Sequence, residues 1–262
     1  MNSSGQSRSP PTALIILALV GIIALYYLYQ FLYSSTALTP TVIVSDEINT
    51  PPATAPPIPQ PYEGGEYSFN TWVYVTNFRT NQNVKKPIFE LRGNGGAFST
   101  LFVGLGAQTN TLVVRTHTKE PGTAAGEGTT LNLSTDERTA FLKETDASLA
   151  ASNLCDLPNV DLQRWVMVTV VLSGRTIDVY LDGKLARSCV TSSYYKVDPA
   201  GVVPVILGGS TGNTLSGFVA GMSVAPYAMN PGQIYRLYSY GPKANQTFLS
   251  WAQTLFSGKQ AV

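Results

Sequence analysis

The sequence predicts an all-β fold, a two-sheet antiparallel sandwich, carrying one N-terminal transmembrane helix. Only 13% of the 262 residues are charged, against roughly a quarter in typical soluble domains. From residue 62 onward, short apolar, β-branched and aromatic runs alternate with turn residues, which is typical of all-β proteins. A single uncharged apolar stretch stands near the N-terminus.

We expect a short tail, residues 1–11, and then a transmembrane helix over residues 12–33. The segment Thr12–Tyr33 contains no charged residue, and about 20 apolar residues are enough to cross a bilayer. Its tyrosines crowd the C-terminal half, where an aromatic belt meets the lipid headgroups. Two alternatives stay open, a cleaved signal peptide with a site at Ser35-Thr36-Ala37 and a buried core helix.

The distribution of basic residues orients this span. Arg8 and the amino terminus precede it, and the next Lys or Arg is Arg79. Because positive charge is retained on the cytoplasmic side, we expect a single-pass membrane protein. Its N-terminus would lie in the cytoplasm, and the bulk of the chain would lie on the opposite side of the lipid bilayer.

Residues 34–61 are predicted to form a linker. This stretch contains seven prolines, which disfavour helix and sheet and favour extended polyproline II. We interpret it as a passive spacer, and a ligand for a proline-recognition domain is the alternative.

Residues 62–242 are predicted to form the sandwich. Nine strands are expected near Tyr67–Thr76, Pro87–Arg92, Thr100–Gly106, Thr111–Thr118, Trp165–Leu172, Thr176–Leu181, Lys184–Val190, Val203–Leu207 and Gly217–Val224. Trp165–Leu172 is apolar on both faces, which indicates a central strand. Asp182-Gly183 and Ser173-Gly174 fall between adjacent strands, as hairpin turns do. We expect helices at Pro231–Tyr240 and, within an inserted loop, around Thr135–Thr145.

The order and spacing of several segments resemble the laminin-G/concanavalin A-like lectin superfamily. Arg164–Cys189, RWVMVTVVLSGRTIDVYLDGKLARSC, is followed by VILGG at Val205–Gly209 and by a segment that begins GFVAG at Gly217. In that superfamily a Trp-led strand enters a hairpin with a YLDGK turn, and an F-x-G strand precedes a short helix. The resemblance covers Glu66–Pro242 and implies a concanavalin A-like jelly roll.

Within the superfamily, the chain resembles membrane-anchored proteins of large cytoplasmic DNA viruses. These carry a cysteine before the Trp strand and another after the DGK turn, as do Cys155, Trp165, Asp182-Gly183-Lys184 and Cys189 here. The resemblance implies a component of the virion membrane or capsid. Many relatives have an aspartate in the strand after F-x-G, where this chain has Gly221-Met222-Ser223, so metal or sugar binding by analogy is weakened.

The two cysteines are Cys155 and Cys189. They cannot supply the four ligands of a structural zinc site by themselves. Outside the reducing cytosol a disulfide between them is the expected state, and two free buried thiols are the alternative.

We predict that the chain is not an enzyme. His117 is the only histidine and is expected on the surface, whereas a Ser-His-Asp or Cys-His catalyst needs a base beside its nucleophile. A retaining glycosidase needs two carboxyl groups about 5–5.5 Å apart, and the nearest motif, Glu144-Thr145-Asp146, lacks the second Glu. No cofactor is predicted. A calcium site stays open, with Asp156, Asp161 and Asp198 in loops but no D-x-D spacing.

Net charge argues against a nucleic-acid partner, because 16 basic and 16 acidic residues remain once Arg8 is set aside. We consider two functions. The first is a membrane-tethered binding or structural module that contacts protein partners. The second is a lectin that binds glycans, with a ligand face formed by Asp178, Tyr180, Tyr194 and Tyr195.

Residues 243–262 are predicted to form an amphipathic C-terminal helix. Phe248, Trp251 and Leu255 follow the spacing of one helical face. A short isolated helix is marginal in water, so this face either folds back onto the sandwich or docks onto a protein partner.

Overall fold

The computed structural model describes residues 11–34, 41–44, 47–80, 82–94, 99–118, 143, 155–191, 193–208 and 215–242. The chain divides into two units, Met1–Thr39 and Pro40–Val262. The predicted helix around Thr135–Thr145 lies outside the described residues except for Lys143. The predicted C-terminal helix with Phe248, Trp251 and Leu255 also lies outside them.

The first unit contains helix α1, Pro11–Ser34. Its side chains are described from Ile15 to Leu28. None of the helices in the described residues is both long and apolar enough to cross a membrane, so the predicted transmembrane span is not supported.

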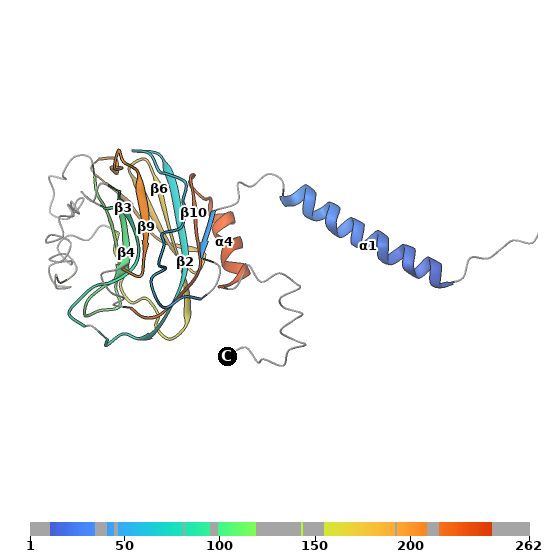
Figure 1. Ribbon diagram of the computed structural model, residues 1–262, viewed down its shortest axis with the longest axis horizontal. Coiled ribbons are helices and arrows are strands. Elements are labelled where there is room, and N and C mark those ends of the chain that lie inside the picture. Colours follow the sequence, from blue (N-terminus) through green and yellow to red (C-terminus); the bar gives the residue numbers. More distant parts are fainter. Residues whose placement is uncertain are drawn as a thin grey trace, which may run out of the picture. The chain divides into compact units, whose positions relative to one another are not determined.

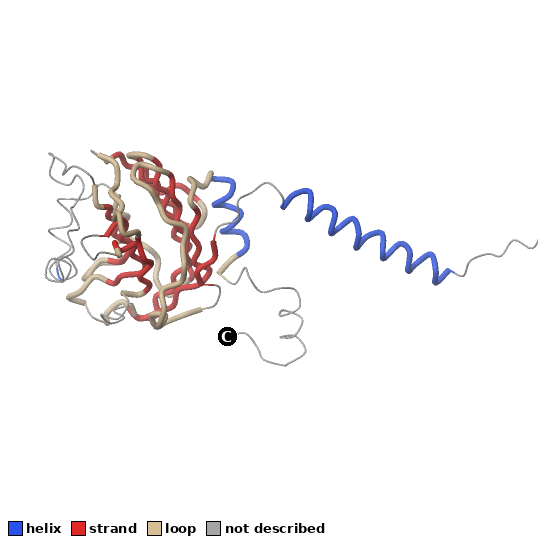
Figure 2. The backbone as a smooth tube through the Cα atoms, turned by 45° about the horizontal axis from the view of Figure 1, so that its top comes forward, coloured by secondary structure: helices blue, strands red, loops and turns tan. Residues whose placement is uncertain are grey.

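The second unit is a sandwich of two antiparallel sheets, as predicted (Figures 1 and 2). One sheet has six strands in the order β1-β10-β2-β6-β7-β8, and the other has four in the order β5-β4-β3-β9. The strands are β1 Thr41–Val44, β2 Glu66–Asn77, β3 Lys86–Gly93, β4 Ser99–Leu105, β5 Leu112–Thr116, β6 Trp165–Ser173, β7 Thr176–Leu181, β8 Lys184–Val190, β9 Val202–Ile206 and β10 Ser216–Ala225. The nine predicted strands are confirmed as β2 to β10.

The main core lies between the two sheets. It is formed by the inward residues of both, and at its centre the rings of Phe69 on β2 and Phe89 on β3 stack at 3.9 Å. Strand β6 is buried along its length and lies between β2 and β7, which confirms its predicted central position. Its two apolar faces are explained by a second apolar layer on the outer side of the six-stranded sheet.

Helix α4, Pro231–Tyr240, covers this outer layer (Figure 1). Asn230 begins the helix with a capping box to Gln233, and Gly241 ends it with a backbone hydrogen bond to Tyr238. The ring of Tyr238 stacks on Trp72 of β2 at 5.6 Å. The helix predicted at these residues is confirmed, and its apolar side explains why β6 is apolar on both faces.

The predicted linker is partly wrong, because residues within 34–61 join the sandwich. Strand β1 pairs with β10, and Ile48 forms a further antiparallel bridge to Val219. Gln60 exchanges two hydrogen bonds with the backbone of Val202. The proline count concealed the proline-free run TVIV, whose β-branched residues suit an edge strand.

The hairpin turns follow from residues that tolerate positive φ. At the β7–β8 turn Asp182 and Gly183 have φ values of 49° and 76°, which fits the type I′ geometry that Asp-Gly favours. The β6–β7 turn is formed by Gly174 and Arg175, one residue later than the predicted Ser173-Gly174. A side chain at Gly183 would also meet Tyr238 of α4 at 3.0 Å, so this turn needs glycine for packing as well.

The predicted disulfide between Cys155 and Cys189 is confirmed, with the two Cα atoms 5.9 Å apart. Cys189 lies on β8, the last strand of the six-stranded sheet. Cys155 is two residues before Leu157, which bridges to Leu112 on the edge strand β5 of the other sheet. The bridge therefore ties the edge of one sheet to the edge of the other.

Removing this bridge should lower stability. We expect the double variant Cys155→Ser/Cys189→Ser to lose about 4 kcal/mol in a chain-entropy account of a closed loop of this size. The measurement is thermal unfolding of the full chain with and without dithiothreitol. The variant should melt below the wild type under oxidising conditions, and reductant should abolish the difference. Equal midpoints under oxidising conditions would show that the bridge does not constrain the unfolded chain.

Candidate functional site

The four side chains predicted as a ligand face do not share one open surface. Asp178 and Tyr180 point to the outer side of the six-stranded sheet, but Tyr180 is only 4% exposed in the layer covered by α4. Burial, and then the nearby Asp178, raises the pKa of Tyr180. Tyr195 belongs to the main core, whereas Tyr194 is exposed and lies against the turn at Gly64.

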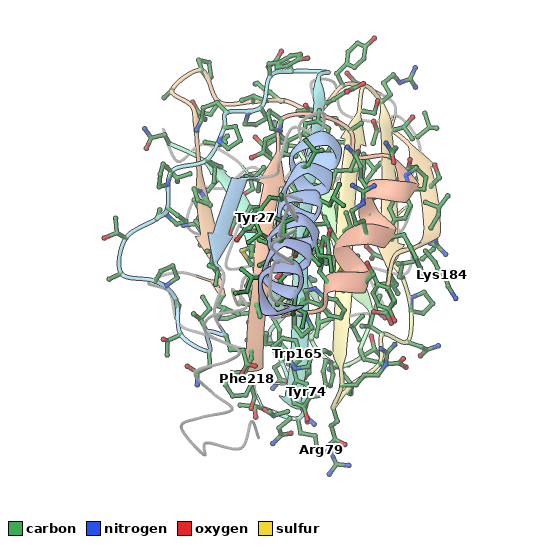
Figure 3. All side chains as sticks on the ribbon, turned by 90° about the vertical axis from the view of Figure 1, so that its right-hand side faces the viewer. Tyr27, Tyr74, Arg79, Trp165, Lys184 and Phe218 are labelled. Carbon is green, nitrogen blue, oxygen red and sulfur yellow. A yellow bond between two sulfur atoms is a disulfide. The ribbon has the colours of Figure 1, made fainter. Side chains whose placement is uncertain are left out.

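A different set of aromatic side chains lies open on the outer side of the six-stranded sheet. Phe218 of β10, Tyr74 of β2 and Trp165 of β6 are direct partners in the strand register. Their ring centroids are 6.5 Å apart for Phe218 and Tyr74 and 5.6 Å apart for Tyr74 and Trp165. All three are half-buried. Figure 3 shows them gathered near one end of the sheet, and we call them the aromatic row.

The local backbone explains why this row is continuous. The core-facing side chains of Val73 and Val75 direct Tyr74 to the opposite face of β2. On β10 the register shifts between Ser216 and Gly217. A Cβ atom at Gly217 would collide with the carbonyl oxygen of Tyr74, so glycine here permits the close strand approach that places Phe218 beside Tyr74.

Three charged side chains lie at the Trp165 end of the row. Arg164 donates from Nε to Asp161 at 2.7 Å and from Nη2 to Asp182 at 2.7 Å. Its Nη1 donates to the carbonyl oxygen of Trp165 at 3.1 Å. These bonds, with Asp182 contributing most and Asp161 next, raise the pKa of Arg164. We call Arg164, Asp161 and Asp182 the carboxylate–guanidinium triad.

Neutral groups lie at the Phe218 end. The hydroxyl of Thr76 donates to the carbonyl oxygen of Ser216 at 2.8 Å and lies 3.1 Å from the Ser216 hydroxyl. Arg79, two residues past the end of β2, is exposed and lies below Tyr74 in Figure 3. A ligand lying along the row would therefore meet hydroxyl groups at one end and the triad at the other.

The aspartates considered for calcium have structural roles. Asp156 is 1% exposed and forms a buried ion pair with Arg115, and it also accepts from the backbone of Val114 at 3.1 Å. Asp198 accepts from the backbone of Ala200 at 2.9 Å. Asp161 bonds to Arg164. Among the residues that the structure describes, no three Asp, Glu, His or Cys side chains group as metal ligands.

The prediction that His117 lies on the surface is wrong, because the side chain is 5% exposed. The chain segment around Tyr195 runs beside it, with a bridge from Thr118 to Tyr195 and a hydrogen bond from Lys196 to the His117 carbonyl oxygen. Burial, and then the charge of Lys196, lowers the pKa of His117. The alternation along β5 could not reveal this long-range neighbour.

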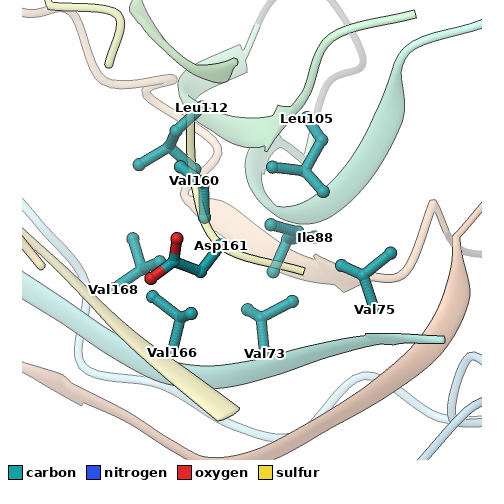
Figure 4. A pocket seen from close by; sticks show the side chains of 9 residues that line it. All are labelled: Val73, Val75, Ile88, Leu105, Leu112, Val160, Asp161, Val166 and Val168. Atoms are coloured by element: carbon teal, nitrogen blue, oxygen red, sulfur yellow. The ribbon is translucent and has the colours of Figure 1, made fainter. Parts of the chain in front are cut away.

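A small cavity lies between the sheets, near the end of the sandwich that carries the aromatic row (Figure 4). It is lined mainly by aliphatic side chains, among them Val73, Leu105 and Leu112, and Asp161 lies at its wall. Its volume of about 10 Å³ is close to the minimum for one water molecule. It cannot hold a sugar ring, so the open aromatic row is the better candidate for ligand binding.

The sequence carries a signal for the aromatic row in the alternation along each strand. Each member alternates with core residues on its own strand, as Trp165 does with Val166 and Phe218 with Val219. Alternation alone predicts an outward aromatic on each of three strands. Their lateral pairing requires the register of β10, which depends on its bulges.

Comparison with known proteins gives a family. Residues 105–235, half of the chain, match the family model described as the concanavalin A-like lectin/glucanases superfamily. No curated protein sequence matches the chain. Solved structures with a similar fold include domain 4 of AbnA, an extracellular arabinanase from Geobacillus stearothermophilus in complex with arabinotriose. It is 11% identical, with 68% of each chain covered and a TM-score of 0.42.

In two further similar structures the match covers only part of the other chain. The receptor-binding domain of botulinum neurotoxin type G is 12% identical, with 66% of this chain and 38% of that chain covered and a TM-score of 0.41. The Trypanosoma rangeli sialidase is 15% identical, with 68% of this chain and 23% of that chain covered and a TM-score of 0.43. This chain thus spans well under half the length of either.

The buried ion pair yields a test that also addresses calcium. Asp156→Ala leaves the Arg115 guanidinium buried without its carboxylate, and breaking such a pair costs about 3–5 kcal/mol. We expect a loss of this size in chemical denaturation. The double variant Arg115→Met/Asp156→Leu should recover part of it, because no lone charge is then buried. A rise in the wild-type midpoint on adding calcium would instead indicate that these aspartates bind a metal.

Proposed function

Because the chain belongs to the concanavalin A-like lectin/glucanases superfamily, we propose that it is a non-catalytic binding module that holds a carbohydrate chain on the aromatic row. The observation that carries the proposal is the in-register alignment of Phe218, Tyr74 and Trp165 across three strands. This reverses the preference drawn from sequence, where protein contacts ranked before glycans.

The geometry of the row suits an extended ligand. Its three rings are spaced 6.5 and 5.6 Å apart, so successive sugar rings can each lie against an aromatic side chain. Aromatic side chains offer large contact area at low cost in conformational entropy, and Tyr and Trp add a polar group. Neighbouring rings are tilted by 55° and 56°. Such a non-planar surface fits a single twisted polysaccharide chain better than the flat face of a crystalline polysaccharide.

We propose binding without catalysis because the hydrogen bonds of the nearby carboxyl groups do not suit glycoside hydrolysis. A retaining glycosidase uses one carboxylic acid as proton donor and one carboxylate as nucleophile. At the aromatic row, Asp161 and Asp182 both accept hydrogen bonds from the same guanidinium, that of Arg164. Neither is placed as a proton donor to a sugar on the row.

Protein contacts are the second candidate function. Leu185 and Val190 are 54% and 58% exposed on β8, the last strand of the six-stranded sheet. Exposed apolar side chains on an edge strand favour pairing with another chain. In this reading the sandwich is a structural module, and the resemblance of its cysteine arrangement to virus proteins supports a role in a virus particle.

We also propose that α1 attaches the sandwich to a lipid bilayer, with the N-terminus cytoplasmic. This rests on the whole sequence run Pro11–Ser34, which has no charged residue. Large apolar side chains from Ile15 to Leu28 are 51% to 73% exposed. Exposed apolar surface of this extent marks an interaction site.

Membrane attachment has a direct test. Full-length protein should remain in the membrane pellet after alkaline carbonate washing. Such washing releases proteins held by charge, but it does not extract an apolar helix buried in lipid. Replacing Leu19, Ile22 and Leu25 with lysine should move the protein to the supernatant. Recovery of the unaltered full chain in the supernatant would refute attachment by α1.

Carbohydrate binding is tested on a glycan array with the full chain in mild detergent. Tyr74→Ala removes the central ring and should weaken binding of the retained glycan by at least about tenfold, which corresponds to about 1.4 kcal/mol. Trp165→Ala should have a similar effect. Thermal unfolding of each variant checks that the fold is kept.

Tyr194→Ala is the matched control, since Tyr194 is 51% exposed but lies outside the row. It should bind as the wild type does. Loss of binding in this variant with retention in Tyr74→Ala would move the site to the face predicted from sequence. Absence of any bound glycan would leave protein contacts as the better candidate.

A further inference from the structure

We infer that the aromatic row selects uncharged sugar chains over acidic ones, through the carboxylate–guanidinium triad at its Trp165 end. The inference rests on the proposed function and deepens it by naming the ligand class. The observation is a local excess of carboxylate, two aspartates for one arginine, and that arginine donates to the carbonyl oxygen of Trp165.

Arg164 is the basic residue nearest to the row along the sequence, because it immediately precedes Trp165. Each of its three nitrogen atoms already donates to the protein: Nε to Asp161, Nη2 to both aspartates, and Nη1 to the carbonyl oxygen of Trp165. Four of the five N–H donors of the guanidinium are thus engaged, so a ligand carboxylate or sulfate could make a two-pronged contact only by displacing one of these acceptors. Acid recognition by arginine normally depends on a free two-pronged face of the guanidinium.

The two aspartates differ in what they can offer a ligand. Asp182 is largely committed to the fold, since its side chain is 20% exposed and also accepts from the backbone of Met167 at 2.9 Å. Asp161 is 61% exposed. An exposed carboxylate accepts hydrogen bonds from hydroxyl groups, which an uncharged sugar has in adjacent pairs.

Charge at this end opposes an acidic ligand. Two carboxylates against one guanidinium give the triad a net charge of −1. A like charge about 4 Å away costs about fivefold in affinity even in bulk water, and more where solvent is excluded. The Phe218 end offers the neutral hydroxyls of Thr76 and Ser216. Arg79 is an exposed cation two residues past the end of β2, and its contribution is tested separately.

The test compares ligands that share a backbone and differ only in charge. Titrations of the full chain in mild detergent would use β-1,4-mannotetraose against tetramannuronate, and cellotetraose against its 6-carboxylated form. We expect the uncharged member of a bound pair to bind at least about fivefold more tightly at low salt. The ratio should shrink as salt is raised, because screening weakens the repulsion.

Variants then assign the selectivity to the triad. Asp161→Asn should weaken the uncharged ligand and narrow the ratio between the two ligands several-fold, with an unchanged unfolding midpoint. Asp178→Asn is the control, because Asp178 is on the same face but bonds to Ser188 on β8 and should leave the ratio unaltered. Arg79→Gln should lower acid binding slightly, because it removes an exposed cation just past the end of β2.

The outcomes separate the two proposals. Acidic members bound as tightly as their uncharged partners, with Tyr74→Ala abolishing binding of both, would overturn the selectivity and leave the carbohydrate site intact. An unchanged ratio in Asp161→Asn would also overturn it. Failure of the chain to bind any array glycan or tetrasaccharide would overturn the proposed function, and the selectivity with it.

Discussion

Strands β2 and β6 impose the constraint on which the rest of the sandwich depends, because both bury side chains on two faces. Their inner side chains meet the four-stranded sheet across the main core, where Phe69 stacks on Phe89. Their outer side chains, Trp72 and Met167 among them, form the second apolar layer under α4. A sheet with a single buried face would alternate with exposed polar residues, whereas on the outer face of β2 even Ser68 and Asn70 are buried.

The same constraint explains why an aromatic surface exists at all. Helix α4 is ten residues long, so it covers only part of the outer face that β2 and β6 make apolar. Trp72 is buried beneath Tyr238, whereas Tyr74, two residues further along the same face, is only half-buried. The aromatic row is the continuation of the covered layer into solvent. Aromatic residues suit such a boundary, since Tyr and Trp combine apolar rings with a polar group.

Local pattern predicted most of the fold, and long-range contact accounts for what it missed. Nine strands and helix α4 followed from the residue pattern near each element, and the disulfide followed from the compartment expected for the sandwich. His117 was expected at the surface because no residue near it in the sequence indicates that the segment around Tyr195 buries it. Tyr180 was expected on an open face because the sequence around it does not show that α4 covers it in the folded chain. The aromatic row required a register set by the bulges of β10, which alternation does not supply.

The linker shows how composition can mislead about function as well as fold. Seven prolines in residues 34–61 suggested a spacer, yet Val44, Ile48 and Ile58 pack against the main core. Pro59 accepts a hydrogen bond from Tyr67, whose pKa is raised chiefly by burial. Proline disfavours a ladder position because it lacks an N–H, but it does not prevent its neighbours from pairing or its own carbonyl from accepting. Most of the predicted spacer is therefore part of the sandwich, and the sequence between α1 and β1 is residues 35–40. Lengthening or shortening residues 48–60 would perturb the folded domain. Any experiment that changes the length of the chain between α1 and the sandwich therefore has to be made within residues 35–40.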